Sequence, residues 1–425
     1  MPTPIPEQAG GRRAGSVARW GLRLLLLAVA GAVLLWAFGY RLKKIQDRTL
    51  SFGEAPQEPT QALGDGAFSG PENLIVFVAD GMGFAHLSAG RAVSGGVDGP
   101  AAWDRFESTG WHRSHPERGF LTDSAASATA LAIGESTFIG AVGVNARGET
   151  RSTLLERAQQ SGFRTGVVTD SYIWDATPAA FSTHTDSRDN AAAILTQLAD
   201  SELEVAFGEL EDVGEDEVPD WATTIGLLEQ RFHMLVSSPG EVWDLRTAPP
   251  APSPVAAVWE EEWITNLDSQ PNLPTLVRVA LDRLDSDERP FALLVESEEP
   301  DSASHRNDLE RLLSGLETIE ATLEVVLDFA ERDGETLVVF TSDHETGGLA
   351  LSVSDESNSI LRAMWSTRNH TGVAVPLLAF GPGAERFSGI HTSAGVGRLL
   401  QSVVGTGDAE DADAGPGEGP GDGGG

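Results

Sequence analysis

Carboxylates recur in this chain at the points where strand-like runs of residues stop. Asp80 follows the run NLIVFVA, Glu296 follows FALLV, and Asp343 comes shortly after TLVVF. A single acid in such a place is usually a turn or helix-cap residue. Three of them at one edge of a sheet would repel one another strongly unless cations held them. Ligands of open α/β sheets bind outside the carboxyl ends of the strands, so the pattern indicates a cation site there.

Histidines accompany some of the acids. Asp301 and His305 are four residues apart, and His344 directly follows Asp343. A set of histidine nitrogens and carboxylate oxygens suits zinc with an open catalytic position. Either pair alone is a weak signal, and His370 in the run NHTG is not distinctive by itself. The remaining histidines have no comparable acidic partner and are expected to be structural or solvated: His86, His112, His115, His184, His233 and His391.

One serine is a candidate nucleophile. Ser124 lies in the run TDSAASATALA, which begins with capping-type residues and continues with good helix formers. It would therefore lie near a helix N-terminus, where free N–H groups and the helix dipole favour a phosphoryl group. A serine needs a base or a metal to act as a nucleophile, and no G-x-S-x-G elbow surrounds this one. Taken alone, this stretch indicates an ordinary capped helix.

The elements that must position these residues alternate along the chain. Apolar runs bounded by turn signals predict buried strands at 73–79, 165–169, 291–295, 336–340 and 375–380. Apolar residues at spacings of three and four from Leu309 to Ala330 predict a helix that ends at Gly334. Strands that alternate with helices favour a three-layer α/β/α fold with a central, mostly parallel sheet.

Composition excludes some classes of function. The chain has no cysteine, so disulfides, thiolate metal sites and cysteine nucleophiles are absent. Its formal net charge of −35 disfavours binding to nucleic acid. A surface suited to high salt and simple colloidal solubility explain this acidity equally well. Acidity does not exclude a phosphate substrate, because bound cations can reverse the sign of the charge locally.

The N-terminal part of the chain differs from the rest. After a short polar segment at 1–19, residues 20–40 (WGLRLLLLAVAGAVLLWAFGY) are apolar, with aromatic residues near both ends and basic residues at the flanks. They predict a transmembrane signal-anchor helix. A cleaved signal peptide, and hence a secreted protein, is the alternative. Residues 41–70 are expected to form a linker, and the acidic, glycine-rich residues 406–425 a disordered tail.

Together these motifs closely resemble the alkaline phosphatase family. The resemblance covers residues 71–405 apart from a poorly matched middle stretch. It rests on five runs in the family's order: VADGMG from Val78, TDSAASATA from Thr122, DATPAA from Asp175, TSDHETGG from Thr341 and NHTG from Asn369. It implies a catalytic domain outside the cytoplasm, periplasmic or extracellular, that hydrolyses small phosphate monoesters, and it suggests a homodimer. With the predicted anchor, the protein would be attached to a membrane.

The resemblance also implies roles for individual residues. Ser124 matches the serine that becomes phosphorylated, and Arg188 matches the arginine that grips the phosphate. The family's two zinc ions would be held by Asp301, His305 and His370 at one site and by Asp80, Asp343 and His344 at the other. Its one magnesium ion would be held by Asp80, Thr177 and Glu296, with Asp175 in contact through water.

The chain departs from the family's pattern in two places. Ser297 and Glu298 replace two glycines that usually follow the glutamate, Pro300 replaces an aliphatic residue, and Ser302 stands where relatives often carry lysine or histidine. Residues 209–275 could not be aligned. Two other functions therefore stay open: a related hydrolase of phosphodiesters or other esters, and a catalytically inactive scaffold stabilised by metals.

Overall fold

The computed structural model describes residues 70–94, 96, 98–210, 221–234, 253–353 and 361–405, together with residues 29, 30 and 33. The predicted anchor, apart from those three residues, lies outside the described residues, as do residues 41–69 of the predicted linker and the tail at 406–425. No helix among the described residues is long and apolar enough to cross a membrane. The chain divides into two units, Met1–Leu63 and Gly64–Gly425, and every element below belongs to the second.

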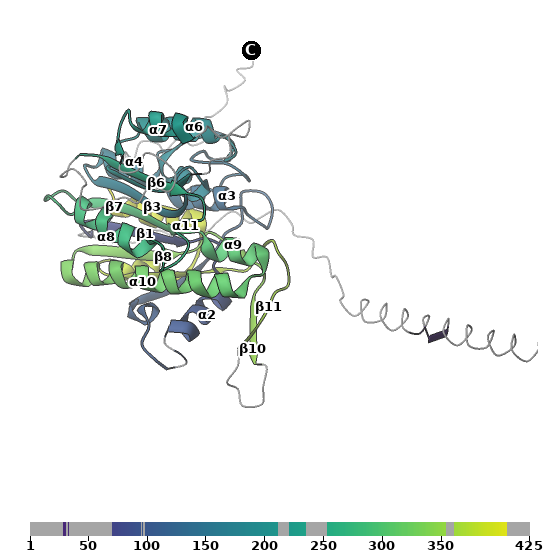
Figure 1. Cartoon of the computed structure of the whole chain (residues 1–425). Coiled ribbons are helices and arrows are strands. Elements are labelled where there is room, and N and C mark those ends of the chain that lie inside the picture. The colour runs from purple at the N-terminus through teal and green to yellow at the C-terminus, as the bar shows by residue number, and fades with distance from the viewer. Residues whose placement is uncertain are drawn as a thin grey trace, which may run out of the picture. The chain divides into compact units, whose positions relative to one another are not determined.

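A single large sheet organises this second unit (Figure 1). Within the described residues it has ten strands, in the order β14 (Gly389–Thr392), β2 (Ser108–Arg113), β13 (Val375–Phe380), β8 (Thr336–Thr341), β1 (Asn73–Ala79), β7 (Phe291–Ser297), β3 (Arg164–Tyr172), β4 (Val205–Leu210), β6 (Val255–Glu260) and β5 (His233–Met234). Only β13 is antiparallel to its neighbours in this sheet. The predicted mostly parallel sheet is therefore confirmed, and all five predicted strands are present.

The central strands are buried along their whole length. Every residue of β1, β7 and β8 is buried, as expected of continuous apolar runs in a sheet covered on both faces. Their registers match as well, because Val76 is paired with Leu294 on one side and with Val339 on the other. The carboxyl ends of these three strands therefore lie side by side at one edge of the sheet.

Helices cover both faces of the sheet. The α-helices are α2 (Phe84–Ser94), α3 (Ser124–Ile133), α4 (Leu154–Gln160), α5 (Ala176–Ser182), α6 (Ala191–Asp200), α7 (Trp221–Leu228), α8 (Leu273–Leu284), α9 (Glu299–Arg306), α10 (Leu309–Asp333) and α11 (Ser393–Val403). In Figure 1, α8 and α10 lie next to each other along one face. On the other face, Leu155 of α4 and Phe181 of α5 pack near Val76, whereas the next residue, Phe77, contacts Phe340. This alternation confirms the three-layer arrangement.

The long helix α10 has the ends that its sequence predicts. The Asp308 side chain accepts a hydrogen bond from the Arg311 backbone N–H at 3.1 Å and caps the N-terminus. Gly334 has a φ of 78°, the left-handed conformation that glycine adopts at a helix end, and its N–H donates to the carbonyl of Ala330. The apolar stripe between these caps packs against the sheet and α8, and α9 joins this helix to β7.

Candidate active site

Three neighbouring strands place the predicted acids next to one another at the carboxyl edge of the sheet. Asp80 directly follows β1, Glu296 is the second-last residue of β7, and Asp343 comes two residues after β8. Because β8, β1 and β7 are adjacent and parallel, the three side chains meet at the carboxyl edge of the sheet. All three residues are buried. The predicted gathering of acids at this edge is confirmed.

The one reversed strand brings in a histidine. Because β13 runs antiparallel to β8, the residues before β13 lie at the edge where the parallel strands end. There β12 (His370–Thr371) pairs with β9 (Glu345–Thr346), which follows the Asp343-His344 pair. The rings of His344 and His370 stack with their centroids 3.6 Å apart. Segments far apart in the sequence thus place two imidazoles in one cluster.

Two groups of side chains have metal-ligand spacing. In each group the potential ligand atoms all lie within 4.8 Å of one another, and the groups are Asp80, Asp343 and His344, and Asp301, His344 and His370. His344 Nε2 lies 3.5 Å from Asp80 Oδ1 and 3.3 Å from Asp343 Oδ2. The first group has the composition of one predicted zinc site. In the second group His344 stands in the place that the sequence gave to His305.

His305 nevertheless lies beside the second group. Asp301 and His305 are one helical turn apart on α9, and His305 Nε2 lies 3.1 Å from Asp301 Oδ2. The same nitrogen lies 3.2 Å from His370 Nε2. The structure therefore brings together all three residues of the other predicted zinc site.

Hydrogen bonds hold the three imidazoles in one orientation. The Nδ1 atoms of His305 and His370 lie 2.6 Å and 2.9 Å from the carbonyl oxygens of Arg368 and Thr122. A carbonyl only accepts, so both Nδ1 atoms must carry the proton. The Thr346 hydroxyl donates to Asp301, so it accepts the hydrogen bond that joins it to Nδ1 of His344. In the neutral rings all three Nε2 atoms are therefore unprotonated and available as metal ligands.

Three buried oxygen atoms of the cluster have no hydrogen-bond partner among the residues that the structure describes. They are Asp80 Oδ1, Asp343 Oδ2 and Thr177 Oγ1, and the residues that carry them are at most 4% exposed. An unpaired polar atom in the interior is costly, so such atoms usually have a role beyond the fold. Two unprotonated imidazole nitrogens that face each other at 3.2 Å, as in His305 and His370, are also suited to share a cation between them. The donor set therefore fits the metal ions that the sequence analysis expects.

The pKa values of the acids reflect the same shortage of partners for buried carboxylates. Burial, followed by the charges of Asp343 and Asp301, raises the pKa of Asp80 well above its ordinary value. Burial and then Asp175 raise the pKa of Glu296 to about 8. Burial also pushes the pKa of Asp301 upward, but in the metal-free protein a hydrogen bond from protonated His305 and the charges of His344 and His305 hold it below its ordinary value. The protein supplies positive partners on the histidine side and few around Asp80 and Glu296.

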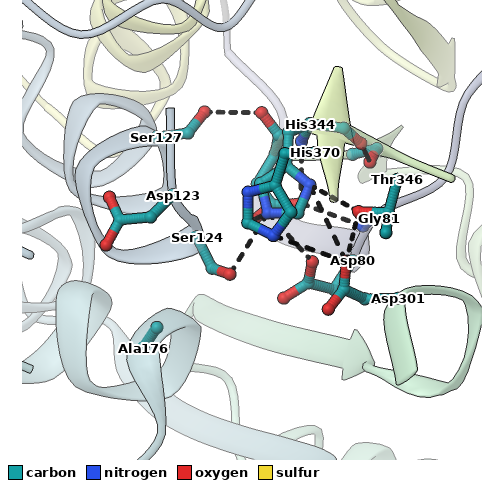
Figure 2. Close-up of polar contacts among 12 residues, drawn as sticks. Asp80, Gly81, Asp123, Ser124, Ser127, Ala176, Asp301, His344, Thr346 and His370 are labelled. Carbon is teal, nitrogen blue, oxygen red and sulfur yellow. Dashed lines mark hydrogen bonds and ion pairs between the residues drawn. The ribbon is translucent and has the colours of Figure 1, made fainter. Parts of the chain in front are cut away.

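Ser124 stands at the centre of this group. It is the first residue of α3, and the Asp123 side chain caps the helix by accepting from the Ala126 N–H at 3.0 Å. The predicted place at a helix N-terminus is confirmed. Ser124 is 5% exposed, and its Oγ lies 3.2 Å from His344 Nε2. Figure 2 shows this hydroxyl pointing toward the two histidines and away from the Asp123 carboxylate.

The structure pairs Arg188 with an acid of the predicted magnesium site. Arg188 Nη2 donates to Asp175 Oδ1 at 2.7 Å, and the same carboxylate oxygen accepts from the Ala176 N–H to cap α5. Burial lowers the pKa of Arg188, but Asp175, Asp123 and Asp80 outweigh it and raise the value. Thr177, the second residue of α5, is fully buried near this pair.

The altered loop after Glu296 is held by a buried acid that sequence reasoning missed. Asp170, inside β3, accepts from Ser297 Oγ at 2.6 Å and from the Glu298 backbone N–H at 2.7 Å. Nothing in the sequence around Asp170 distinguishes it from other acids. The orienting carbonyls of Thr122 and Arg368 were missed as well, because backbone groups leave no signal in the sequence. Thr346, which orients Asp301 and His344, could have been found from its place in the TSDHETGG run.

Gly81 and His86 lie beside the metal-ligand groups and shape the backbone there. Gly81 lets the backbone approach Asp301 closely, because a Cβ there would lie 2.7 Å from the Cα of Asp301, at a φ of +70°. His86 was expected to be structural or solvated, and it is structural: it is fully buried, with Nδ1 accepting from the Gly83 N–H at 3.1 Å. Gly81 and His86 therefore both support the backbone on which the site is built.

Comparisons with known proteins agree with this site. The family model for alkaline phosphatase matches residues 71–209 and 258–364. Alkaline phosphatase 3 of Bacillus subtilis (strain 168) is 30% identical over 327 residues, which cover 73% of this chain and 69% of the relative. The structure of alkaline phosphatase from the Antarctic bacterium TAB5 aligns at a TM-score of 0.70 and 26% identity, covering 79% of this chain and 98% of that chain. A TAB5 variant with Mg bound in its M3 site gives the same values. The chain therefore belongs to the alkaline phosphatase family and is a phosphomonoester hydrolase.

Proposed function

We propose that this protein hydrolyses phosphate monoesters in two steps through a phosphoserine at Ser124. In the first step a bond forms between Ser124 Oγ and phosphorus, and the bond from phosphorus to the alcohol oxygen breaks. In the second step water attacks phosphorus and releases Ser124 and inorganic phosphate. The observation that carries the proposal is the 3.2 Å approach of Ser124 Oγ to His344 Nε2, beside buried carboxylate oxygens without hydrogen-bond partners in the described part of the chain.

The proposal assigns metal ions to three sets of side chains. Asp301, His305 and His370 would hold one zinc ion, and Asp80, Asp343 and His344 the other. Asp80, Thr177 and Glu296 would hold a magnesium ion, with Asp175 in contact through water. When bound, these cations would neutralise the carboxylates and make the serine hydroxyl and a water molecule acidic enough to act as nucleophiles near neutral pH. The TAB5 variant with bound Mg supports the magnesium assignment by similarity.

The chain's own residues prepare Ser124 for attack. Its position at the start of α3 directs free N–H groups and the positive end of the helix dipole toward the phosphoryl group. His344 is fixed by Thr346, so its Nε2 stays directed at the serine oxygen. The stacked ring of His370 and the buried surroundings keep bulk water away from this oxygen. Positioning and charge neutralisation of this kind supply most of the catalysis in phosphoryl transfer.

Arg188 is proposed to bind the phosphate oxygens. Its planar fork has more donors than the single bond to Asp175 uses, so it can hold two phosphate oxygens in a bidentate manner. Asp175 orients the guanidinium, which is positively charged at any working pH. The arginine thereby contributes positive charge in a part of the site that is otherwise acidic.

Hydrolysis of two esters tests the proposal. The full chain should hydrolyse p-nitrophenyl phosphate much faster than bis-p-nitrophenyl phosphate, and EDTA should abolish the activity. Restoration by zinc together with magnesium should exceed restoration by either metal alone. Faster hydrolysis of the diester would instead support the phosphodiesterase alternative. No metal-dependent hydrolysis of either ester would support the scaffold alternative.

The placement of the protein is a separate proposal. Residues 20–40 would anchor the chain in a membrane, with the catalytic domain outside the cytoplasm. Mass spectrometry of the mature protein distinguishes an intact anchor from a secreted protein whose N-terminal residues have been removed. A homodimer, expected from the family resemblance, stays a prediction that sedimentation analysis can test.

A further inference from the structure

Exposed apolar side chains lie around the opening of the candidate active site. Phe120, Leu121, Ile139 and Val373 are each about half exposed, between 49% and 52%. They come from three segments of the chain, and the contacts described below join each segment to the site. Single exposed apolar side chains are ordinary on a protein surface, whereas a group of them at one place marks a binding surface. These four side chains are called the apolar rim.

Two of the segments lie side by side at His370. The Thr122 carbonyl accepts from His370 Nδ1 at 2.9 Å. Two residues away from each of these positions, the ring of Phe120 packs against the backbone of Gly372, where a Cβ would collide with three carbons of the ring. The glycine therefore leaves room for the ring. Since Val373 directly follows this glycine, Phe120 and Val373 form the part of the apolar rim on the His370 side.

The third segment lies near the proposed phosphate-binding arginine. Gly140, next to Ile139, donates its N–H to Asp123 Oδ2 at 3.0 Å, and its carbonyl accepts from the Arg188 N–H at 2.8 Å. The parts of the apolar rim therefore have different neighbours. Ile139 lies beside the segment that holds the arginine, whereas Phe120 lies beside the segment that carries a metal-ligand histidine.

The direction of the reaction decides which part of the rim meets the alcohol. In phosphoryl transfer the attacking and leaving oxygens lie roughly in line, on opposite sides of phosphorus. Ser124 Oγ approaches from the side of His344, whose side chain is fully buried. The side chains of His370 and His305 are 19% and 39% exposed, so the site opens past them. The alcohol part of a substrate therefore extends toward the His370 side, where Phe120 lies.

We propose that Phe120, with Val373 nearby, is a specificity-determining residue that contacts the alcohol part of the substrate, so that the enzyme prefers phosphate monoesters of aromatic alcohols. This inference rests on the phosphomonoester hydrolysis of the proposed function. A flat ring such as a benzyl group can lie against the exposed part of Phe120, and pairs of aromatic rings are worth more than the area they bury. A polyol such as glycerol has no comparable apolar surface and gains little from this contact.

Hydrolysis of benzyl phosphate and glycerol 2-phosphate tests the inference. Both are phosphates of aliphatic alcohols, so they differ mainly in the surface that the alcohol presents to the rim. The full chain with zinc and magnesium should have a kcat/KM about 10-fold or more higher for benzyl phosphate. Phe120→Ser should lower this ratio about 10-fold, through a higher KM for benzyl phosphate with little change in kcat. Phe120→Tyr keeps a ring and should keep most of the preference.

Two controls distinguish a substrate contact from a structural role. Inorganic phosphate has no alcohol part, so its inhibition constant should change less than about twofold in Phe120→Ser. A constant that rises as much as the KM for benzyl phosphate would mean that Phe120 acts only by positioning the Thr122 carbonyl and His370, and it would overturn the inference. Ile390→Ser is the matched variant, because it removes an apolar side chain that is 58% exposed on the edge strand β14. It should leave the ratio unchanged.

The other outcomes are equally distinct. A wild-type protein with equal kcat/KM for both esters overturns the inference and leaves the proposed function intact, whereas hydrolysis of neither ester overturns both. If Phe120→Ser keeps the ratio but converts a dimer into a monomer, a second copy of the chain covers Phe120 and the inference is wrong. Should Phe120→Ser not fold, Phe120→Leu carries the test, because it keeps an apolar side chain without the ring. It should lower the ratio about threefold, and an unchanged ratio there would count against the inference.

Discussion

The two ends of strand β3 carry buried charges of opposite character. At its first residue, the side chain of Arg164 is 1% exposed and donates to Glu204 Oε2 from Nε at 2.9 Å and from Nη2 at 2.6 Å. Its Nη1 donates to the Leu284 carbonyl at 2.9 Å. Near the other end, Asp170 faces the acids of the active site, and the chain continues to Asp175. The charge at the first end is neutralised within the protein, whereas the other end lies near carboxylates whose buried oxygens have no hydrogen-bond partner among the described residues.

This difference distinguishes Arg164, a structural charge that the protein itself compensates, from the acids at the other end of β3, which have a functional role. A buried ion pair must be complete, because an uncompensated charge in the interior is strongly destabilising. The cluster at the carboxyl edge breaks this rule, with several raised pKa values close together. Such a cluster persists in a protein when ligands complete it. Removing a charge should therefore damage the fold at the first end of β3 and the activity at the other.

Loss of the nucleophile gives the largest expected effect. Ser124→Ala should lower kcat about 10⁴-fold or more and abolish labelling of the enzyme by ³²P-phosphate, because no covalent intermediate can form. The melting temperature should change little, since Asp123 still caps α3 and only one hydrogen bond is lost. Ser127→Ala is the matched control in the same helix. A Ser124→Ala protein that still became labelled at this site would contradict the covalent mechanism.

The opposite result is expected at the start of β3. Arg164→Leu should lower the free energy of unfolding by about 3 kcal/mol, because the largely buried Glu204 loses its main partner. Metal content and KM should stay unchanged. Arg151→Leu is a suitable control, because this arginine pairs with Glu135 and Glu149 at the surface and should cost less than about 1 kcal/mol. Denaturant titration of the two variants measures the difference. Equal losses of unfolding free energy would show that the buried pair stabilises the fold no more than the surface pairs do.

The Arg164 end of β3, where the charge is paired, and the active-site end, where the acids are not, also differ in how well the sequence predicts them. The active-site end lies at the carboxyl ends of three apolar strands, β1, β7 and β8. The acids predicted at the ends of these strands lie there in the structure. Ser124 at a helix start followed from its capping residues. The grouping of these residues into ligand sets came from the family resemblance, because the spacing of residues cannot tell which distant loops meet.

Other features had no signal in the sequence. Arg164 looked like any arginine before a strand, and its partner Glu204 is 40 residues away. The direction of β13, which brings His370 to the site, depends on sheet topology rather than on local pattern. Asp170 supports the loop of Glu298 through contacts with residues more than a hundred positions away. Such long-range partners are set by the fold, so only the structure identifies them.

Arg188 tests whether a cation at the active end is needed for the fold. Arg188→Ala should raise KM for p-nitrophenyl phosphate about 10- to 100-fold, the scale of a lost charged hydrogen bond. Stability should change by less than about 1 kcal/mol, because the arginine is only partly buried and bonds one carboxylate. Arg188→Lys should recover little, since an ammonium lacks the bidentate fork. A stability loss as large as that of Arg164→Leu would make Arg188 a structural residue.

The smallest expected effect concerns the stability of the metal-free protein above pH 6.5. Glu296 has an ordinary pKa of 4.5 and a folded pKa of about 8, caused by burial and by Asp175. The folded protein therefore keeps a proton there that the unfolded chain has released, and stability falls as pH rises toward 8. His86 and His112, whose pKa burial lowers to about 4, act in the opposite sense, but only below their ordinary value of 6.5.

Denaturant titrations of the EDTA-treated chain between pH 6.5 and 8 should therefore show a loss of about 1.4 kcal/mol per pH unit for each such proton. Glu209 is the internal control, because burial also raises its pKa to about 8 but it accepts from the backbone N–H groups of Glu262 and Ile264 rather than facing the site. Added zinc and magnesium should remove the contribution of Glu296, and Glu209→Gln should remove a separate part of the slope with or without the metals. If added metals leave the slope unchanged, Glu296 does not bind them. The acids of the active-site end would then need no metal ions to compensate them, as Arg164 needs none beyond Glu204.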